Sequence, residues 1–267
     1  MPIADVRGQH LYYEDTGGAG PALVLGHGFL MDGTMFEAQV RAFAGSHRVI
    51  TWDQRGHGRT VSSTEPCTLW DLTDDLAALL DHLGVENAVV GGMSQGGFIA
   101  LRFALEHPDR TAGLVLIDTQ SGVEDPDKAI QYDLMHQVWV SSGPSDQLLE
   151  MVAAIIIGNR RPESRGWTAA WKAREPAGLT QIYRTLMERD DITERLGEIQ
   201  APAIVIHGAE DVAIDLSLAE ALCSRLAGCR GVVRIEGAGH ASCLTHPEPV
   251  NEAIAGFLAT IRARERA

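Results

Sequence analysis

The sequence lacks the features that would place this chain in a membrane, outside the cell or on a nucleic acid. The first ten residues contain no basic segment followed by an apolar run, so we expect no secretory signal. No apolar stretch reaches the roughly 18 residues that a membrane-spanning helix needs. Basic clusters are also missing, and a formal net charge of −14 disfavours binding to nucleic acid and anionic membranes. We therefore expect a cytoplasmic protein with neither nucleic-acid nor membrane partners.

Cysteine is scarce, and its spacing indicates no special chemistry. The four cysteines form no CxxC pair and no Cys/His spacing typical of a metal site; they are Cys67, Cys223, Cys229 and Cys243. Cysteines in a cytoplasmic protein are normally reduced. The sequence therefore predicts reduced structural thiols and no bound metal.

The composition is that of an ordinary globular domain, with 45% hydrophobic and 22% charged residues in 267. Short apolar runs alternate with helical patterns, which predicts an α/β fold with a doubly wound, mostly parallel sheet. Residues 3–16 look like an antiparallel hairpin at its edge. The expected strands are residues 22–27, 48–52, 88–91, 113–117, 203–206 and 232–235. The expected helices include one after the capping box of Thr68 and Asp71, with Gly84 as its stop, and others at 95–106 and 250–261.

Residues 120–200 differ from the rest because they contain no convincing strand. This interval is helical by pattern and holds three of the five tryptophans, Trp139, Trp167 and Trp171. Most of its apolar residues are expected to form its own core. We therefore predict an α/β core of residues 1–119 and 201–267, with residues 120–200 inserted as a helical cap.

Only one of the twelve serines lies in a G-x-S-x-G pattern, Ser94 in Gly92-Met-Ser-Gln-Gly96. The pattern directly follows an expected strand and directly precedes an expected helix. This is the setting of a nucleophile elbow, a sharp turn that exposes the serine hydroxyl and has no room for side chains at the flanking glycines. A phosphate-binding turn is the alternative, but the chain has neither G-x-G-x-x-G nor G-K-[ST] here. Ser94 is therefore the predicted nucleophile.

A serine hydroxyl needs a base, and the base needs a group that orients it. His240 follows the last expected strand, and Asp211 follows the strand before it, which gives the chain order Ser94, Asp211, His240. Acyl transfer also needs donors for the developing oxyanion. We predict the backbone N–H groups of Gln95 and Phe29. The alternatives are His246 for the base and Asp118, Glu210 and Asp215 for the acid.

Five segments together resemble the α/β-hydrolase family, within it the esterase, enol-lactonase and cofactor-free perhydrolase branch. They are HGF (27–29), DQRGHG (53–58), GGMSQGG (91–97), HGAED (207–211) and GAGH (237–240). The resemblance covers most of the chain outside the cap. It implies an acyl-serine intermediate that water hydrolyses, with no cofactor. Asp53, Arg55 and Gly56 match a family loop that we interpret as structural. Met93 departs from the polar residue common at its position, which would make the floor of the site more apolar.

The expected function is therefore hydrolysis of a small-molecule carboxylic ester or lactone, with Met93, Trp139 and Trp171 as candidate pocket residues. A serine nucleophile argues against haloalkane dehalogenase and epoxide hydrolase activities, which use aspartate in this fold. Carbon–carbon bond hydrolysis or perhydrolysis with the same triad is one alternative. A hydrolase-like ligand receptor with slow turnover is another, since fold alone does not decide function. A monomer or a homodimer is expected on general frequency.

Overall fold

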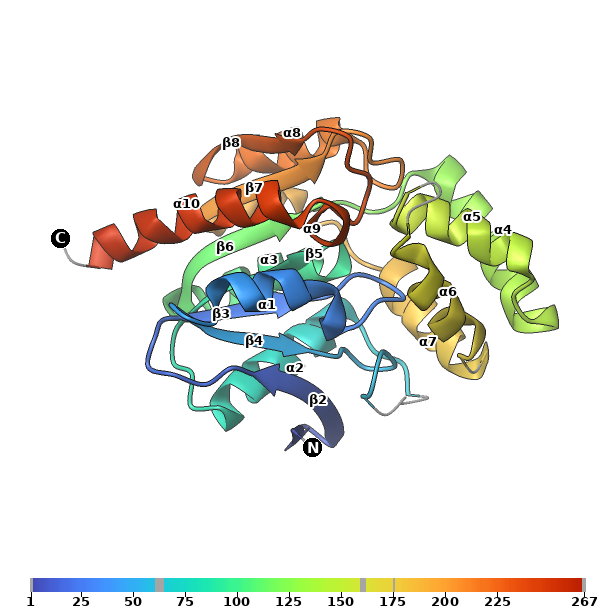
Figure 1. The fold of residues 1–267 in the computed structure, drawn as a ribbon, viewed down its shortest axis with the longest axis horizontal. Helices are drawn as coiled ribbons and strands as arrows, with labels where there is room; N and C mark the ends of the chain where they lie inside the picture. The colour runs from blue at the N-terminus through green and yellow to red at the C-terminus, as the bar shows by residue number, and fades with distance from the viewer. Residues whose placement is uncertain (1, 61–64, 159–161, 175, 266–267) are drawn as a thin grey trace.

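The computed structural model describes residues 2–60, 65–158, 162–174 and 176–265. They form an eight-stranded sheet with helices on both faces (Figure 1). The strands are β1 (Ile3–Val6), β2 (Gln9–Asp15), β3 (Ala22–Gly26), β4 (Arg48–Trp52), β5 (Ala88–Met93), β6 (Thr111–Ile117), β7 (Pro202–Gly208) and β8 (Gly228–Ile235). Their order is β1-β2-β4-β3-β5-β6-β7-β8; β2 pairs antiparallel with both β1 and β4, and the other neighbouring strands pair parallel. The predicted α/β fold and edge hairpin are confirmed.

Two helical layers bury the two faces of this sheet. One layer contains α1 (Glu37–Phe43), α9 (Ser242–Thr245) and α10 (Pro247–Glu265), and the other contains α2 (Leu69–His82), α3 (Gln95–Glu106) and α8 (Leu216–Arg225) (Figure 1). Strand β3 shows why both layers are needed: Leu23 and Leu25 pack toward the first, Ala22 and Val24 toward the second. Successive residues of a strand point to opposite faces, so an all-apolar strand must be covered on both.

The start of α2 illustrates how local sequence fixes these elements. Asp71 N–H donates to Thr68 Oγ1 at 3.2 Å, and Thr68 N–H donates to Asp71 Oδ2 at 2.8 Å, so the predicted capping box is present. Such a cap stabilises a helix by about 0.5–2 kcal/mol. After the helix, Gly84 takes φ +64°, a conformation that favours glycine and ends the helix there.

A helical insertion separates β6 from β7. Its helices are α4 (Pro126–Ser142), α5 (Asp146–Ile156), α6 (Ser164–Lys172) and α7 (Pro176–Met187), and they lie beyond the carboxyl ends of the strands (Figure 1). The described residues between 120 and 200 form no strand, as expected. Short 3-10 helices complete the chain at η1 (Gly33–Phe36), η2 (Pro108–Arg110) and η3 (Thr193–Glu198). No helix in the described part of the chain is long and apolar enough to cross a membrane.

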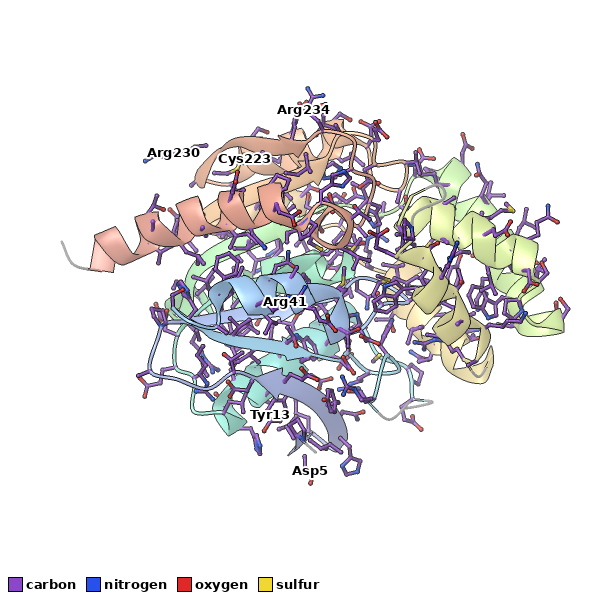
Figure 2. The ribbon with its side chains drawn as sticks, viewed as in Figure 1. Asp5, Tyr13, Arg41, Cys223, Arg230 and Arg234 are labelled. Carbon is purple, nitrogen blue, oxygen red and sulfur yellow. A yellow bond between two sulfur atoms is a disulfide. The ribbon has the colours of Figure 1, made fainter. Side chains whose placement is uncertain are left out.

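The expectation of four reduced cysteines is wrong for two of them. Cys223 near the end of α8 and Cys229 in β8 form a disulfide. Their Cα atoms are 5.4 Å apart, within the range that a disulfide spans, because a tight turn joins the two elements. Strand β8 also begins earlier than predicted and is largely exposed; Figure 2 shows Arg230 and Arg234 pointing away from the molecule. Spacing motifs did not reveal this pair, because pairing depends on distance in the fold.

Candidate active site

Ser94 forms a strained turn between β5 and α3. The strand ends at Met93 and the helix begins at Gln95, so Ser94 alone reverses the chain direction, with φ 51° and ψ −112°. A non-glycine residue in this region costs about 1–3 kcal/mol. Three hydrogen bonds hold it there: Ser94 N–H donates to Ile117 O at 2.9 Å, and Ser94 O accepts from Thr119 Oγ1 at 2.9 Å and from Phe98 N–H at 3.0 Å.

The two glycines of the pattern are required by close contacts with β3. A Cβ atom at Gly96 would lie 1.9 Å from the carbonyl oxygen of Gly26, and one at Gly92 would lie 2.3 Å from the same atom. This oxygen belongs to the backbone of β3 and cannot move aside. The G-x-S-x-G pattern therefore follows from the packing of α3 and β5 against β3, as the sequence interpretation supposed.

His240 and Asp211 form a buried pair in the loops after β8 and β7. His240 Nδ1 lies 2.7 Å from Asp211 Oδ2, while Asp211 Oδ1 accepts the N–H groups of Ala213 and Ile214 at 2.8 and 3.0 Å. Burial lowers the pKa of His240, but the charge and hydrogen bond of Asp211 outweigh it and raise that pKa above its usual value. Burial raises the pKa of Asp211, and the interaction with His240 lowers it overall. Asp211 is thus held as a carboxylate that orients the imidazole.

Asp118, the main alternative acid, is buried beside this pair, but its carboxylate bonds groups other than His240. Its carboxylate accepts Gly208 N–H at 2.8 Å, and Ser242 N–H and Oγ at 2.9 and 2.7 Å. Burial and the charge of Asp211 raise its pKa to about 6. It therefore ties together the loops that carry Asp211 and His240.

The remaining alternatives lie elsewhere. Asp215 is the N-cap of α8 and accepts Ser217 N–H at 2.9 Å, while Glu210 is exposed. His246 follows α9, with Nδ1 3.0 Å from Thr245 Oγ1, and it does not line the cavity described below. The structure therefore pairs His240 with Asp211, and Asp215, Glu210 and His246 take no part in this pair.

Among the described residues, one group has the composition of a metal site. Asp118, His207 and Asp211 each bring one donor atom within 4.8 Å of the others. However, both Asp carboxylates already accept N–H groups, and His207 Nε2 lies 2.9 Å from Ile214 O, so this nitrogen carries a hydrogen. The same nitrogen lies 3.3 Å from Asp211 Oδ2. Hydrogen bonds to other groups of the protein therefore already engage both carboxylates and His207 Nε2.

The predicted oxyanion donors lie on either side of a buried polar network. Gln54 N–H donates to His27 Nε2 at 2.9 Å, so His27 carries its hydrogen on Nδ1 and donates it to Gly28 O at 2.8 Å. Gln54 Nε2 donates to His27 O at 2.6 Å, and Gln95 Nε2 donates to Gln54 Oε1 at 2.5 Å. This network ties the loop that carries Phe29 to the start of α3, where the first N–H groups of a helix have no partner within it.

A mainly apolar cavity lies over Ser94 and His240. Phe29 and Met93 line it from the sheet side, and α4, α5 and α7 line it from the helical insertion, with Trp139 among their residues. Trp171 does not line the cavity: its indole is buried and donates to Leu30 O at 2.7 Å, behind the loop that carries Phe29. Of the three predicted pocket residues, the structure thus brings Met93 and Trp139 to the cavity.

Sequence reasoning missed the polar residues of this cavity other than Ser94 and His240. They are Glu124, Tyr132, His136 and Tyr183, from the chain before α4, from α4 and from α7. No motif marks them, because helical periodicity alone does not show which face of the insertion looks toward Ser94. The nearest signal is the spacing of His136 and Trp139, three residues apart and so on one face of a helix.

Comparison with known proteins gives consistent results over nearly the whole chain. A family model described as alpha/beta hydrolase fold matches residues 21–148. A "Putative carbamate hydrolase RutD" of Caulobacter vibrioides is 32% identical, covering 97% of this chain and 98% of that one. A solved thermophilic esterase from Thermogutta terrifontis has 30% identity and a TM-score of 0.87, covering 97% of each chain. The enol-lactonase from Burkholderia xenovorans has 26% identity and a TM-score of 0.88, covering 97% of this chain and 100% of that one.

Proposed function

This chain belongs to the α/β-hydrolase family, and we propose that it hydrolyses a carboxylic ester or a lactone with Ser94 as nucleophile. The observation that carries the proposal is the buried His240–Asp211 pair at 2.7 Å, which shares a cavity with the strained Ser94. Residues with these chemical types and this chain order can perform acyl transfer without a cofactor.

The reaction proceeds through two acyl transfers. His240 Nε2 accepts the Ser94 hydroxyl proton as Ser94 Oγ attacks the carbonyl carbon, and the Phe29 and Gln95 N–H groups donate to the oxyanion. The C–O bond of the ester then breaks, and His240 gives the proton to the leaving alcohol. Water enters, loses a proton to His240 and attacks the acyl carbon, which releases the acid and restores Ser94. Asp211 stabilises the imidazolium in both halves.

The helical insertion acts as a cap in this proposal, with residues 1–119 and 201–267 as the core and residues 120–200 as the cap. Support comes from the cavity, whose walls away from the sheet are supplied by α4, α5 and α7. A pocket with apolar walls favours hydrophobic substrates, because it buries their apolar surface. The cap therefore sets which ester is accepted, while the core performs the chemistry.

Steady-state hydrolysis of p-nitrophenyl butyrate by the parent, Ser94→Ala and Ser224→Ala tests the proposal. Loss of a serine nucleophile typically lowers kcat by at least about 10³-fold. Ser224 is an exposed serine of α8 whose hydroxyl donates to Ala221 O of the same helix, so its variant should match the parent. Substantial activity in Ser94→Ala, with a normal thermal melt, would contradict the proposal.

The carbamate named for the Caulobacter relative suggests a second candidate substrate. A carbamate presents the same carbonyl carbon to Ser94, and the attack needs the same groups. Its acyl-enzyme carries a nitrogen beside the carbonyl, which makes the carbon less electrophilic. A p-nitrophenyl N-methylcarbamate assayed beside the butyrate distinguishes the two: turnover of the carbamate at a comparable kcat would favour it, whereas one burst without turnover would favour the ester.

A further inference from the structure

Two ring nitrogens in the cavity have no hydrogen-bond partner among the described residues. Trp139 Nε1 and His136 Nε2 are both buried, and both side chains line the cavity from α4. Trp139 is only 2% exposed. A buried polar group without a partner costs free energy, so such groups in a binding site usually find one on the ligand. Two of them on one helix face mark a polar position in a mainly apolar wall.

The His136 ring is held in a fixed orientation. It stacks on Tyr183 of α7 with ring centroids 4.2 Å apart and an interplanar angle of 5°. Tyr183 is in turn anchored to α4, because its hydroxyl donates to Asp133 Oδ1 at 2.6 Å. The position of His136 Nε2 is therefore set before a ligand arrives, which reduces the entropy lost on binding.

The chemistry of the two nitrogens limits what they can bind. Indole N–H only donates, whereas a neutral imidazole nitrogen either donates or accepts. Burial lowers the pKa of His136, which keeps the ring neutral near pH 7. A hydroxyl, a ketone or an ester oxygen can satisfy either nitrogen. Each accepts from Trp139 N–H or from a protonated His136 Nε2, and a hydroxyl can also donate to an unprotonated His136 Nε2.

The charge around the cavity argues against an anionic group on the substrate. The described lining residues include no lysine or arginine, but they include Glu124, whose Oε2 lies 3.4 Å from Arg189 Nη2. A second carboxylate brought into this space would be desolvated without a cation of its own. The cavity therefore favours uncharged substrates.

We propose that His136 and Trp139 form a distal subsite that binds an uncharged oxygen on the part of the substrate inside the cavity. The substrate class is then a neutral ester or lactone that carries a hydroxyl, ketone or second ester oxygen, and not a half-ester of a dicarboxylic acid. This inference rests on the proposed function, because it assigns the cavity over Ser94 to the substrate.

Matched ester series test the subsite. The test compounds are ethyl hexanoates that carry a hydroxyl or a ketone at successive acyl carbons. The comparison compounds are unsubstituted ethyl hexanoate and the monoethyl ester of adipic acid. We expect kcat/KM of the parent to be about tenfold higher for the best oxygenated ester than for the plain one, the range of one or two good hydrogen bonds. The adipate monoester should be at least about tenfold poorer than the plain ester.

Variants then assign the preference to the two nitrogens. Trp139→Phe and His136→Phe keep an aromatic ring and remove the nitrogen, so each should bring the oxygenated-to-plain ratio of kcat/KM close to one. Met135→Leu is the matched control, since Met135 also lines the cavity and offers no strong polar atom. Its ratio should stay within about twofold of the parent value, whatever happens to the individual rates.

The outcomes separate this inference from the proposed function. A parent with equal rates across the series, a preference that survives both Phe variants, or a preference for the adipate monoester would overturn the subsite. Absence of hydrolysis of every ester would overturn the proposed function instead, and calorimetric binding to Ser94→Ala would then decide the subsite. Tighter binding of the oxygenated ester that Trp139→Phe abolishes would support it, and equal binding of both esters would refute it.

Discussion

Replacing Asp211 with asparagine should cost far more activity than replacing Asp118, although both carboxyl groups are buried beside His240. Asp211 Oδ1 accepts two backbone N–H groups, so an asparagine would keep its oxygen there and turn its NH₂ group toward His240 Nδ1. The imidazole would then carry its hydrogen on Nε2, where it cannot accept the Ser94 proton. We expect kcat to fall by about 10⁴-fold, the loss known for this tautomer change in a serine triad.

Asp118→Asn has a different expected result. The Asp118 side chain bonds Gly208 and Ser242, so its replacement leaves the hydrogen bond between His240 and Asp211 in place. It removes a negative charge that helps to raise the pKa of His240, so that pKa should fall. We expect the acid limb of kcat/KM to move to lower pH by up to about one unit, with kcat near pH 8 reduced by no more than about tenfold.

The assay is kcat and kcat/KM on p-nitrophenyl butyrate between pH 5 and 9, with thermal melts to show that both variants fold. The reasoning would be refuted if both variants melt normally, kcat of Asp118→Asn falls about 10³-fold and kcat of Asp211→Asn falls less than tenfold. Asp118 would then be the orienting acid, and the contact of Asp211 with His240 would be incidental.

Three further predictions follow from the same geometry. In the parent, kcat/KM should fall as pH drops through a pKa above about 6.5, because His240 must be neutral to act as a base and its pKa is raised; a limb well below pH 6 would contradict this. Gly96→Ala places a Cβ against Gly26 O, so denaturation should show a loss of about 3 kcal/mol or more in the free energy of unfolding, and an unchanged midpoint would count against the packing. Replacing Cys223 and Cys229 by serine should lower the free energy of unfolding by about 2 kcal/mol, as expected for a short loop, and leave kcat unchanged; two free thiols in the unreduced parent would contradict the disulfide.

The parts of the fold that were predictable are those that local sequence determines. The capping box at Thr68, the apolar strands and the helix that begins at Gln95 each depend on neighbours within a few residues. The turn at Ser94 was predictable for a related reason. Its flanking glycines are needed because α3 and β5 pack closely against β3, and this close packing recurs in sharp strand-to-helix turns of this kind. The chain order of the catalytic residues then predicted Asp211 and His240.

The rest depends on contacts between distant parts of the chain. The disulfide required knowing that a turn brings Cys229 back to α8, and its spacing of six residues has no characteristic meaning. Nothing in the sequence distinguishes Trp171 from Trp139. In the structure, Trp171 donates a hydrogen bond to Leu30 O, whereas Trp139 lines the cavity. The stacking of His136 on Tyr183 joins two helices of the insertion, and no periodicity in either helix indicates it.

Intact mass after reaction with a fluorophosphonate probe tests the central claim most directly, because the probe reacts covalently with an activated serine. The parent and Ser224→Ala should each gain one adduct, whereas Ser94→Ala should gain none and His240→Ala should react far more slowly. An adduct on Ser94→Ala, or none on a folded parent, would contradict the assignment of Ser94 as the nucleophile.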